Sequence, residues 1–170
     1  SYIKSLDTKE ALLRSKEWYF NNKIDLNLST NIKFINHKNK SLSDEKDKLY
    51  HYDKLVIATG SKNNLLGIDT KEYQKGNFFS LRNLEDSKRI RKKISEVQTI
   101  TIIGAGFIGL EIATTALQLN KDVTIVENSE KVMGRSISKD LSKWLINYYT
   151  KSGIKFIFNK SFKSFKSDEN

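Results

Sequence analysis

The 170-residue sequence contains no cysteine and no proline, and it has no long apolar run. Without cysteine the chain has no disulfide framework, no thiolate metal site and no redox dithiol, so any redox chemistry must come from a bound cofactor. Its longest apolar runs, such as Leu55–Ala58, are far too short to cross a bilayer. The N-terminus has no basic and then apolar signal pattern, so we expect a cytoplasmic protein.

Acidic residues are in the minority, since 30 lysines and arginines face 20 aspartates and glutamates for a formal net charge of +10. A basic surplus is also the mark of nucleic-acid-binding proteins. The lysines are scattered through every segment, however, which favours a solvated basic surface over a functional anion-attracting field. The densest cluster, at residues 88–93, falls on the predicted outer face of a helix. Its predicted inner face consists of Leu84, Ile90, Ile94 and Val97.

Residues 1 to about 53 predict a short helix followed by strands. The stretch from Ala11 to Phe20 has a helical pattern. Apolar residues then alternate with polar ones over residues 24–28, as in strands with one buried face.

Polar, turn-forming residues later in this region predict a hairpin between Ile32–Asn36 and Leu49–Tyr52. Neither His37 nor His51 has a metal-ligand partner at suitable spacing. We therefore expect both histidines to be structural or solvent-facing, and we expect no metal site.

Residues Tyr52–Ser61 predict a buried strand that ends in a turn of small residues. The continuous apolar run Leu55–Ala58 suits a parallel strand covered on both faces. The small residues after it, Thr59 and Gly60, allow another backbone or a phosphate to come close.

The strongest signal lies between Thr99 and Glu127. The β-branched run Thr99–Ile103 leads without a gap into Gly104-Ala105-Gly106-Phe107-Ile108-Gly109. A helix is predicted next, ended by Asn120 in the left-handed conformation, and then a strand over residues 123–126 closed by Glu127. This order of strand, glycine turn, helix, strand and acid predicts a dinucleotide-binding unit. The residues expected on one side of its helix are Ile108, Ile112, Ala116 and Leu119.

Each glycine of the turn has a physical role in such a unit. Gly104 permits the tight turn out of the strand, Gly106 removes a side chain that would block a pyrophosphate, and Gly109 lets the helix pack close to the sheet. The free N–H groups and the positive dipole end of the helix then meet the phosphate charge. The alternative is a turn that serves only tight packing in an unrelated unit.

Glu127 is the candidate for reading the adenosine ribose. It lies 127 − 104 = 23 residues beyond the first glycine, where a carboxylate can accept both ribose hydroxyl hydrogens. A 2′-phosphate would meet like charge at this point, so we expect NADH rather than NADPH. Lys131 and Arg135 lie nearby in the sequence, and their positive charges would reduce the preference for NADH over NADPH.

A further helix and strand follow Glu127. Ser138 or Ser136 caps the predicted helix, Gly153 ends it, and residues 154–158 form the next strand. The order continues as strand, helix and strand, so the sheet should be parallel with right-handed crossovers. Three aromatic residues of this helix are expected to pack in a core or interface rather than stack on nucleic-acid bases. They are Trp144, Tyr148 and Tyr149.

Taken together, these motifs resemble the FAD-dependent pyridine nucleotide-disulfide oxidoreductases, and among them the rubredoxin reductase, ferredoxin reductase and nitrite reductase large-subunit type. The Ala58–Ser61 turn and the Gly104–Glu111 run carry the resemblance, with Leu81–Asp86 between them. The resemblance implies an α/β fold with a Rossmann-like parallel sheet. It assigns residues 1–80 to part of an FAD-binding domain and residues 81–170 to part of an NAD-binding domain.

The resemblance also implies positions near FAD. Thr59 and Gly60 would lie beside this cofactor, and the Ile32 backbone near its adenine. The first glycine motif for FAD in this family would lie upstream of Ser1, so the chain resembles the middle of an enzyme. We therefore expect the 170 residues alone not to bind FAD tightly.

Toward NADH, the resemblance implies roles for three side chains. Phe107 matches an aromatic position that gates the nicotinamide pocket, Glu111 an acidic position close to the nicotinamide, and Arg135 a basic position at the adenosine end.

The implied activity is an electron transfer without side-chain acids or nucleophiles, so no residue is expected to be catalytic. NADH would pass a hydride to the flavin, and electrons would continue to a redox protein or a small acceptor. A non-catalytic NAD-sensing module is the first alternative, but it does not explain Tyr52–Ser61. A basic nucleic-acid-binding domain is the second, and it leaves the glycines unexplained.

Overall fold

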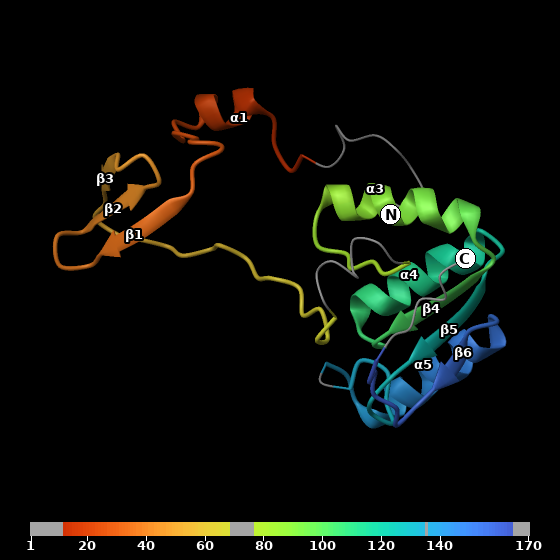
Figure 1. The fold of residues 1–170 in the computed structure, drawn as a ribbon. Helices are drawn as coiled ribbons and strands as arrows, with labels where there is room; N and C mark the ends of the chain where they lie inside the picture. Colours follow the sequence, from red (N-terminus) through yellow and green to blue (C-terminus); the bar gives the residue numbers. More distant parts are fainter. Residues whose placement is uncertain (1–11, 69–76, 135, 165–170) are drawn as a thin grey trace. The chain divides into compact units, whose positions relative to one another are not determined.

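The computed structural model describes residues 12–68, 77–134 and 136–164. The chain forms two compact units, which in the described part divide between Ser61 and Lys62 (Figure 1). The assignment of residues 1–80 to FAD and 81–170 to NAD is a functional division and stays a prediction. Across the described residues, no helix is both long and apolar enough to span a bilayer.

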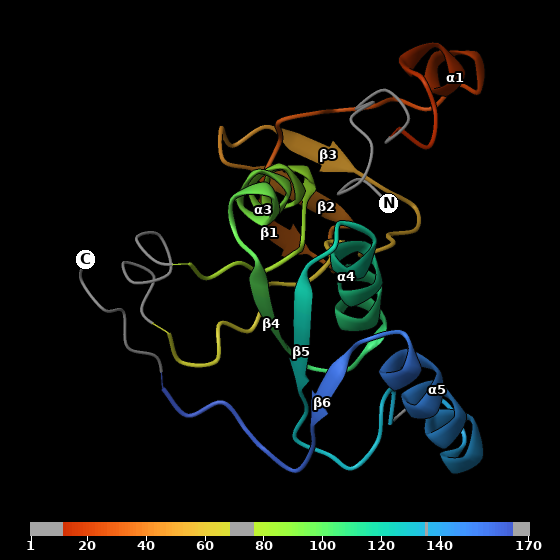
Figure 2. The same ribbon diagram turned by 90° about the vertical axis from the view of Figure 1, so that its right-hand side faces the viewer.

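The unit after Lys62 is built around a three-stranded parallel sheet of order β4-β5-β6 (Figure 2). This confirms the parallel sheet predicted from the sequence. Its elements are α3 (Leu84–Glu96), β4 (Thr99–Ile103), α4 (Phe107–Gln118), β5 (Asp122–Val126), α5 (Lys139–Lys151) and β6 (Lys155–Ile157).

One face of this sheet forms the core of the unit. The strand register places Ile102 beside Ile125 and Thr101 beside Thr124. Both isoleucines are buried, whereas Thr101 is exposed, which is the alternation expected of a sheet with one covered face. The residues that join the two isoleucines in the core come from α4, β5 and the connections. They are Ala105, Leu110, Ala113, Ala116, Val123, Val132 and Ile154.

The buried face of α4 differs from the predicted one. Ile108 and Leu119 were expected to face the same way as Ala116, but they are 54% and 37% exposed, and Leu110 and Ala113 are buried instead. The start of the helix explains the difference, because Gly109 lies directly against the Gly104 carbonyl and so sets the helix rotation. The left-handed end predicted at Asn120 is confirmed by a φ of 57°.

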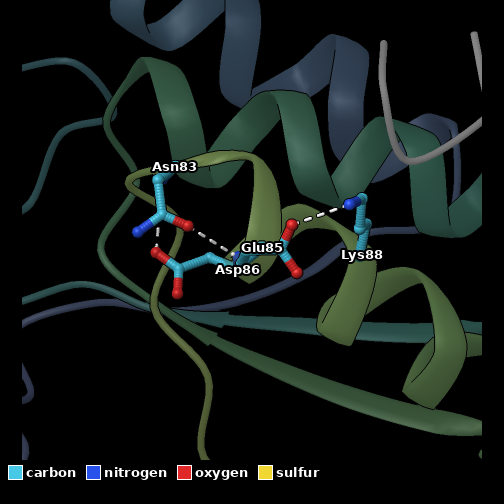
Figure 3. A network of polar contacts seen from close by, with 4 residues as sticks. All are labelled: Asn83, Glu85, Asp86 and Lys88. Atoms are coloured by element: carbon cyan, nitrogen blue, oxygen red, sulfur yellow. Dashed lines mark hydrogen bonds and ion pairs between the residues drawn. The ribbon is translucent and has the colours of Figure 1, made fainter. Parts of the chain in front are cut away.

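Helix α3 begins with a capping box (Figure 3). The Asp86 N–H donates to Asn83 Oδ1 over 2.9 Å, and the Asn83 N–H donates to Asp86 Oδ2 over 3.3 Å, so each side chain satisfies a backbone donor that the helix leaves free. The Glu85–Lys88 pair, at 2.7 Å, is solvent-exposed and adds little stability. Ile90 and Ile94 are buried as the predicted inner face requires.

Helix α5 places its aromatic residues on two sides. Tyr149 packs against the core, but Trp144 and Tyr148 are 58% and 54% exposed, so these two do not pack in the core of this unit, and their packing in an interface stays a prediction. Their rings stack on each other with centroids 5.5 Å apart. The reason is helical spacing: Trp144 and Tyr148 are four residues apart and share one side of the helix, whereas Tyr149 lies one residue further round, with its ring edge-on to that of Tyr148.

The other unit is a three-stranded antiparallel sheet of order β1-β2-β3, preceded by a short helix. Its elements are α1 (Lys16–Asn21), β1 (Ile32–Asn36), β2 (Ser41–Asp44) and β3 (Leu49–His51). The predicted hairpin between Ile32–Asn36 and Leu49–Tyr52 is wrong, because β2 lies between these strands. Asn36 Oδ1 accepts from the Lys38 and Asn39 N–H groups and turns the chain early, so the residues after it form a strand.

Asp44 closes the second turn of this sheet. Its carboxylate accepts from the Lys46 N–H at 2.9 Å, the Lys48 N–H at 3.0 Å and the Tyr50 hydroxyl at 2.9 Å. Burial raises the pKa of Asp44, but the bonds from Lys48, Tyr50 and Lys46 outweigh it and leave this pKa lowered.

Two further strand predictions in this unit are wrong. Residues 24–28 and 52–61 form no strand, and most of their apolar side chains are open to solvent, with Val56 85% and Ile57 66% exposed. An apolar run becomes a strand only by pairing with a neighbour, and within residues 12–68 neither run is paired in a sheet. The predicted first helix begins only at Lys16; Ala11 lies outside the described residues.

Candidate dinucleotide-binding site

The glycine turn lies at the carboxyl ends of the parallel strands, where open α/β sheets bind ligands. Gly104 leaves β4 with a φ of 99°, a conformation that side chains disfavour. Its N–H donates to the Val126 carbonyl over 2.8 Å and thereby joins the ends of β4 and β5.

The two later glycines of the turn differ in their surroundings. A Cβ on Gly109 would collide with the carbonyl oxygen of Gly104, so only glycine allows α4 to lie this close to the turn. A Cβ on Gly106 would meet no protein atom within 4 Å. Gly106 is the N-cap of α4 and brings no side-chain cap, so the helix N-terminus is open to an anion at this point.

Glu127 follows β5 and reaches back to the glycine turn. Its Oε2 accepts from the Ala105 N–H over 2.8 Å, and its Oε1 accepts from both the Ser129 N–H and the Ser129 hydroxyl over 2.9 Å each. Burial raises the pKa of Glu127, but hydrogen bonds from Ala105, Ser129 and the Asn128 backbone together leave this pKa lowered. The carboxylate is therefore ionised at neutral pH and held beside the turn.

The connection after Glu127 is anchored on both sides. The Met133 N–H donates to the Ala105 carbonyl over 2.9 Å, and the buried hydroxyl of Ser142 on α5 donates to the Val132 carbonyl over 2.9 Å. The glycine turn and this connection enclose the first hollow, of about 670 Å³. Its lining residues are Ala105, Gly106, Phe107, Glu127, Asn128, Ser129, Glu130, Lys131, Met133, Gly134 and Ser136.

A second hollow of about 550 Å³ follows the side of α4. Glu111 lines it, and Phe107 and Met133 line both hollows, so the two adjoin. The Phe107 side chain is 64% exposed at their junction. The other residues of the second hollow are Leu110, Thr114, Thr115, Gln118 and Tyr149.

The residues predicted to lie near FAD come from the other unit. Thr59, Gly60 and Ile32 lie in the other unit, all three exposed, and Gly60 has a φ of 73°. Arg135 lies outside the described residues. In the part of the chain that the structure describes, no three histidine or acidic side chains gather as metal ligands would.

Sequence reasoning missed several residues of the first hollow, among them Ser129, Glu130 and Met133. Ser129 could have been found from its position two residues after the acid, where Ser and Thr often bond to a preceding side chain. Met133 contributes through its backbone bond to Ala105, and a backbone bond leaves no signal in residue type.

The geometry fits a dinucleotide in three respects. An ionised carboxylate stands at the carboxyl end of β5, the helix N-terminus beside Gly106 is open, and two adjoining hollows extend from this point. Residues 4–170 match the family model described as pyridine nucleotide-disulphide oxidoreductase. The chain belongs to this family. The family resemblance drawn from the motifs is thereby confirmed.

Relatives within the family have similar sequences and folds. A rubredoxin-NAD(+) reductase of Ectopseudomonas oleovorans is 32% identical over 154 residues, which cover 91% of this chain and 40% of that protein. The crystal structure of a ferredoxin reductase from Rhodopseudomonas palustris matches with a TM-score of 0.88 and 26% identity over 98% of this chain and 41% of that one. Putidaredoxin reductase, in its covalent complex with putidaredoxin, matches with a TM-score of 0.87 and 28% identity over 98% of this chain and 40% of that one.

These likenesses confirm the α/β fold class with its parallel sheet. The chain spans only 40% and 43% of the length of the two rubredoxin-NAD(+) reductases that it matches.

Proposed function

We propose that the chain is the NADH-binding portion of an FAD-dependent oxidoreductase, which passes electrons from NADH through the flavin to a redox protein or a small acceptor. The observation that carries the proposal is the Glu127 carboxylate, ionised and fixed beside the open Gly106 turn. Membership of the family and relatives named as NAD(+) reductases support it.

In this proposal the first hollow holds the adenosine half of NADH. The diphosphate lies over Gly106, where the N-terminus of α4 offers unpaired N–H groups and the positive end of its dipole. Glu127 accepts hydrogen bonds from the ribose hydroxyls, and Arg135 contacts the adenosine end.

The nicotinamide half extends past Phe107 toward Glu111 in the second hollow. The exposed Phe107 ring, which lines both hollows, would gate the nicotinamide pocket. Thr59, Gly60 and the Ile32 backbone contact FAD. When bound, NADH supplies a hydride and FAD accepts it; the protein aligns the two rings and excludes water. A cytoplasmic location stays a prediction.

Charge at the first hollow favours NADH over NADPH. A 2′-phosphate would lie against the ionised Glu127 and cannot donate the hydrogen bonds of a ribose hydroxyl. Glu130 also lines the hollow and adds negative charge, while Lys131 offsets part of it.

The test is a titration of the protein with NADH and with NADPH, followed by nicotinamide fluorescence. We expect NADH to bind more tightly, and Glu127→Ala to lose roughly tenfold in NADH affinity, as for a hydrogen bond to a charged group. Glu130→Ala is the matched control and should change NADH affinity little. It removes another carboxylate from the lining of the same hollow, but not the one that is hydrogen-bonded to the glycine turn. Equal or tighter binding of NADPH by the wild-type protein would contradict the proposal.

A second measurement separates the enzyme from a non-catalytic NAD-sensing module. The proposed enzyme carries flavin, so the intact parent protein should absorb light in the flavin range, and NADH should bleach this band. An intact parent protein that binds NADH without flavin absorbance would favour the sensor.

A further inference from the structure

We propose that Ser129 is a positioning residue for nucleotide recognition, which holds the Glu127 carboxylate toward the ribose. This inference rests on the proposed function, since it concerns how Glu127 binds NADH.

The carboxylate is held from two sides. The Ala105 N–H donates to Oε2 from the glycine turn, and both donors of Ser129 reach Oε1 from the connection after β5. A glutamate side chain without such bonds would keep several rotamers. With them, one orientation of the carboxylate is fixed before any ligand binds.

Ser129 is itself fixed by the strand next to it. Glu127 donates its N–H to the Ile157 carbonyl of β6 over 2.9 Å and accepts from the Lys160 N–H over 3.1 Å. The Asn159 N–H donates to the Ser129 carbonyl over 3.2 Å. The segment from Glu127 to Ser129 therefore behaves as an extension of the sheet, and the Ser129 donors keep their places.

The Ser129 hydroxyl has a choice of acceptor. Its oxygen lies 2.9 Å from Glu127 Oε1 and also 2.9 Å from the Lys131 carbonyl oxygen, but a hydroxyl has only one hydrogen to donate. The two bonds thus alternate, and the structure accommodates both without movement of the backbone.

In either arrangement the Ser129 N–H stays on Oε1, so the carboxylate keeps its orientation, and the hydroxyl adds a second donor to the same oxygen when it turns to it. A ribose offers its two hydroxyl groups as hydrogen-bond donors to a carboxylate that is already oriented. NADPH, whose 2′ position carries a phosphate, offers only one such donor.

The experiment compares Ser129→Ala, Ser129→Cys and Ser129→Thr with the wild-type protein by fluorescence titration of NADH and NADPH. Ser129→Ala should weaken NADH binding about three- to tenfold, the effect of one hydrogen bond to a charged group, and should narrow the gap to NADPH. Ser129→Thr keeps the hydroxyl, so its affinity for NADH and its preference for NADH over NADPH should match those of the wild-type protein. Ser129→Cys keeps the volume with a weak donor and should resemble Ser129→Ala, which covers the case that alanine impairs folding.

The pH profile gives a readout that a packing role would not change. Losing the hydroxyl bond raises the pKa of Glu127, so NADH affinity in Ser129→Ala should fall at a higher pH on acidification than in the wild-type protein. Ser95→Ala, which removes an exposed serine hydroxyl from α3, is the control and should change neither profile nor affinity.

The possible outcomes distinguish a failure of this inference from a failure of the proposed function. If wild-type protein prefers NADH and Glu127→Ala abolishes the preference, but Ser129→Ala and Ser129→Cys bind like wild type with an unshifted pH profile, the inference is overturned and the proposed function stands. If wild-type protein does not prefer NADH, the proposed function fails and the inference fails with it.

Discussion

Gly106 and Gly109 stand in one turn, and the space around each assigns them different tasks. Where a Cβ on Gly109 would strike the Gly104 carbonyl, a Cβ on Gly106 would project into the open hollow. Gly109 therefore serves the fold, and Gly106 leaves room for a ligand.

We predict opposite effects of alanine at these two positions. Gly109→Ala should lower the free energy of unfolding by about 1–3 kcal/mol, since the backbone must shift to relieve the clash. Gly106→Ala should leave the melting temperature within a few degrees of wild type, yet should weaken NADH binding because its methyl group enters the diphosphate position. Thermal unfolding and NADH titration of both variants check the pair. Unimpaired NADH binding by Gly106→Ala would place the diphosphate elsewhere.

At this scale, the sequence located Glu127 but not its partners. Its distance along the chain from Gly104 marks the acid, because strand and helix lengths in such units are similar. The bonds from Ala105 and Ser129 depend on how the ends of β4 and β5 meet, which no residue pattern states.

Among the helices, α5 shows how an element boundary is chosen. The sequence allowed either Ser136 or Ser138 as the cap. In the structure Ser138 is the N-cap, and its hydroxyl accepts from the Leu141 N–H over 3.2 Å.

Replacing the cap should therefore matter at only one of the two serines. We predict that Ser138→Ala lowers the free energy of unfolding by about 1 kcal/mol, the usual loss on removal of a serine cap. Ser136→Ala is the matched control and should change it by less than about half of that. Chemical denaturation of the two variants decides between them, and a larger loss in Ser136→Ala would show that the helix begins earlier.

Whether a strand was predicted correctly depends on where its partner strand lies in the sequence. β4 and β5 pair with each other across one short helix, so local pattern and tertiary pairing agree. The apolar run Leu55–Ala58 has a strong pattern but no strand beside it in residues 12–68, and three of its four residues, from Val56 to Ala58, are exposed. A hydrophobic pattern predicts which residues are stabilised by burial, but it does not show which other segment of the protein packs against them.

The 170 residues carry a net charge of +10. The scatter of the lysines favours a solvated surface, but under the proposed function the alternative, a field that attracts an acidic electron acceptor, can be tested. A basic protein attracts an acidic redox protein over distances beyond contact, and salt screens this attraction.

With an acidic redox protein as acceptor and NADH saturating, the second-order rate constant of acceptor reduction should fall about tenfold between roughly 0.05 and 0.5 M salt. With an uncharged small acceptor it should change little, which provides the control. Stopped-flow measurement of flavin reoxidation gives both rate constants. A salt-independent reaction with the acidic protein would argue that the basic surface has no part in docking.

Sequence alone determined the parallel unit from Thr99 to Glu127, the glycine turn and the family, because these rest on local conformational preferences and on spacings within one continuous segment. Tertiary structure alone decided which face of α4 is buried, that β2 separates β1 from β3, and that Ser129 and Ala105 hold the Glu127 carboxylate. These depend on the close approach of Gly109 to Gly104, on strand pairing and on hydrogen bonds across strand ends. Such contacts join residues according to position in space, and residue type constrains them only weakly.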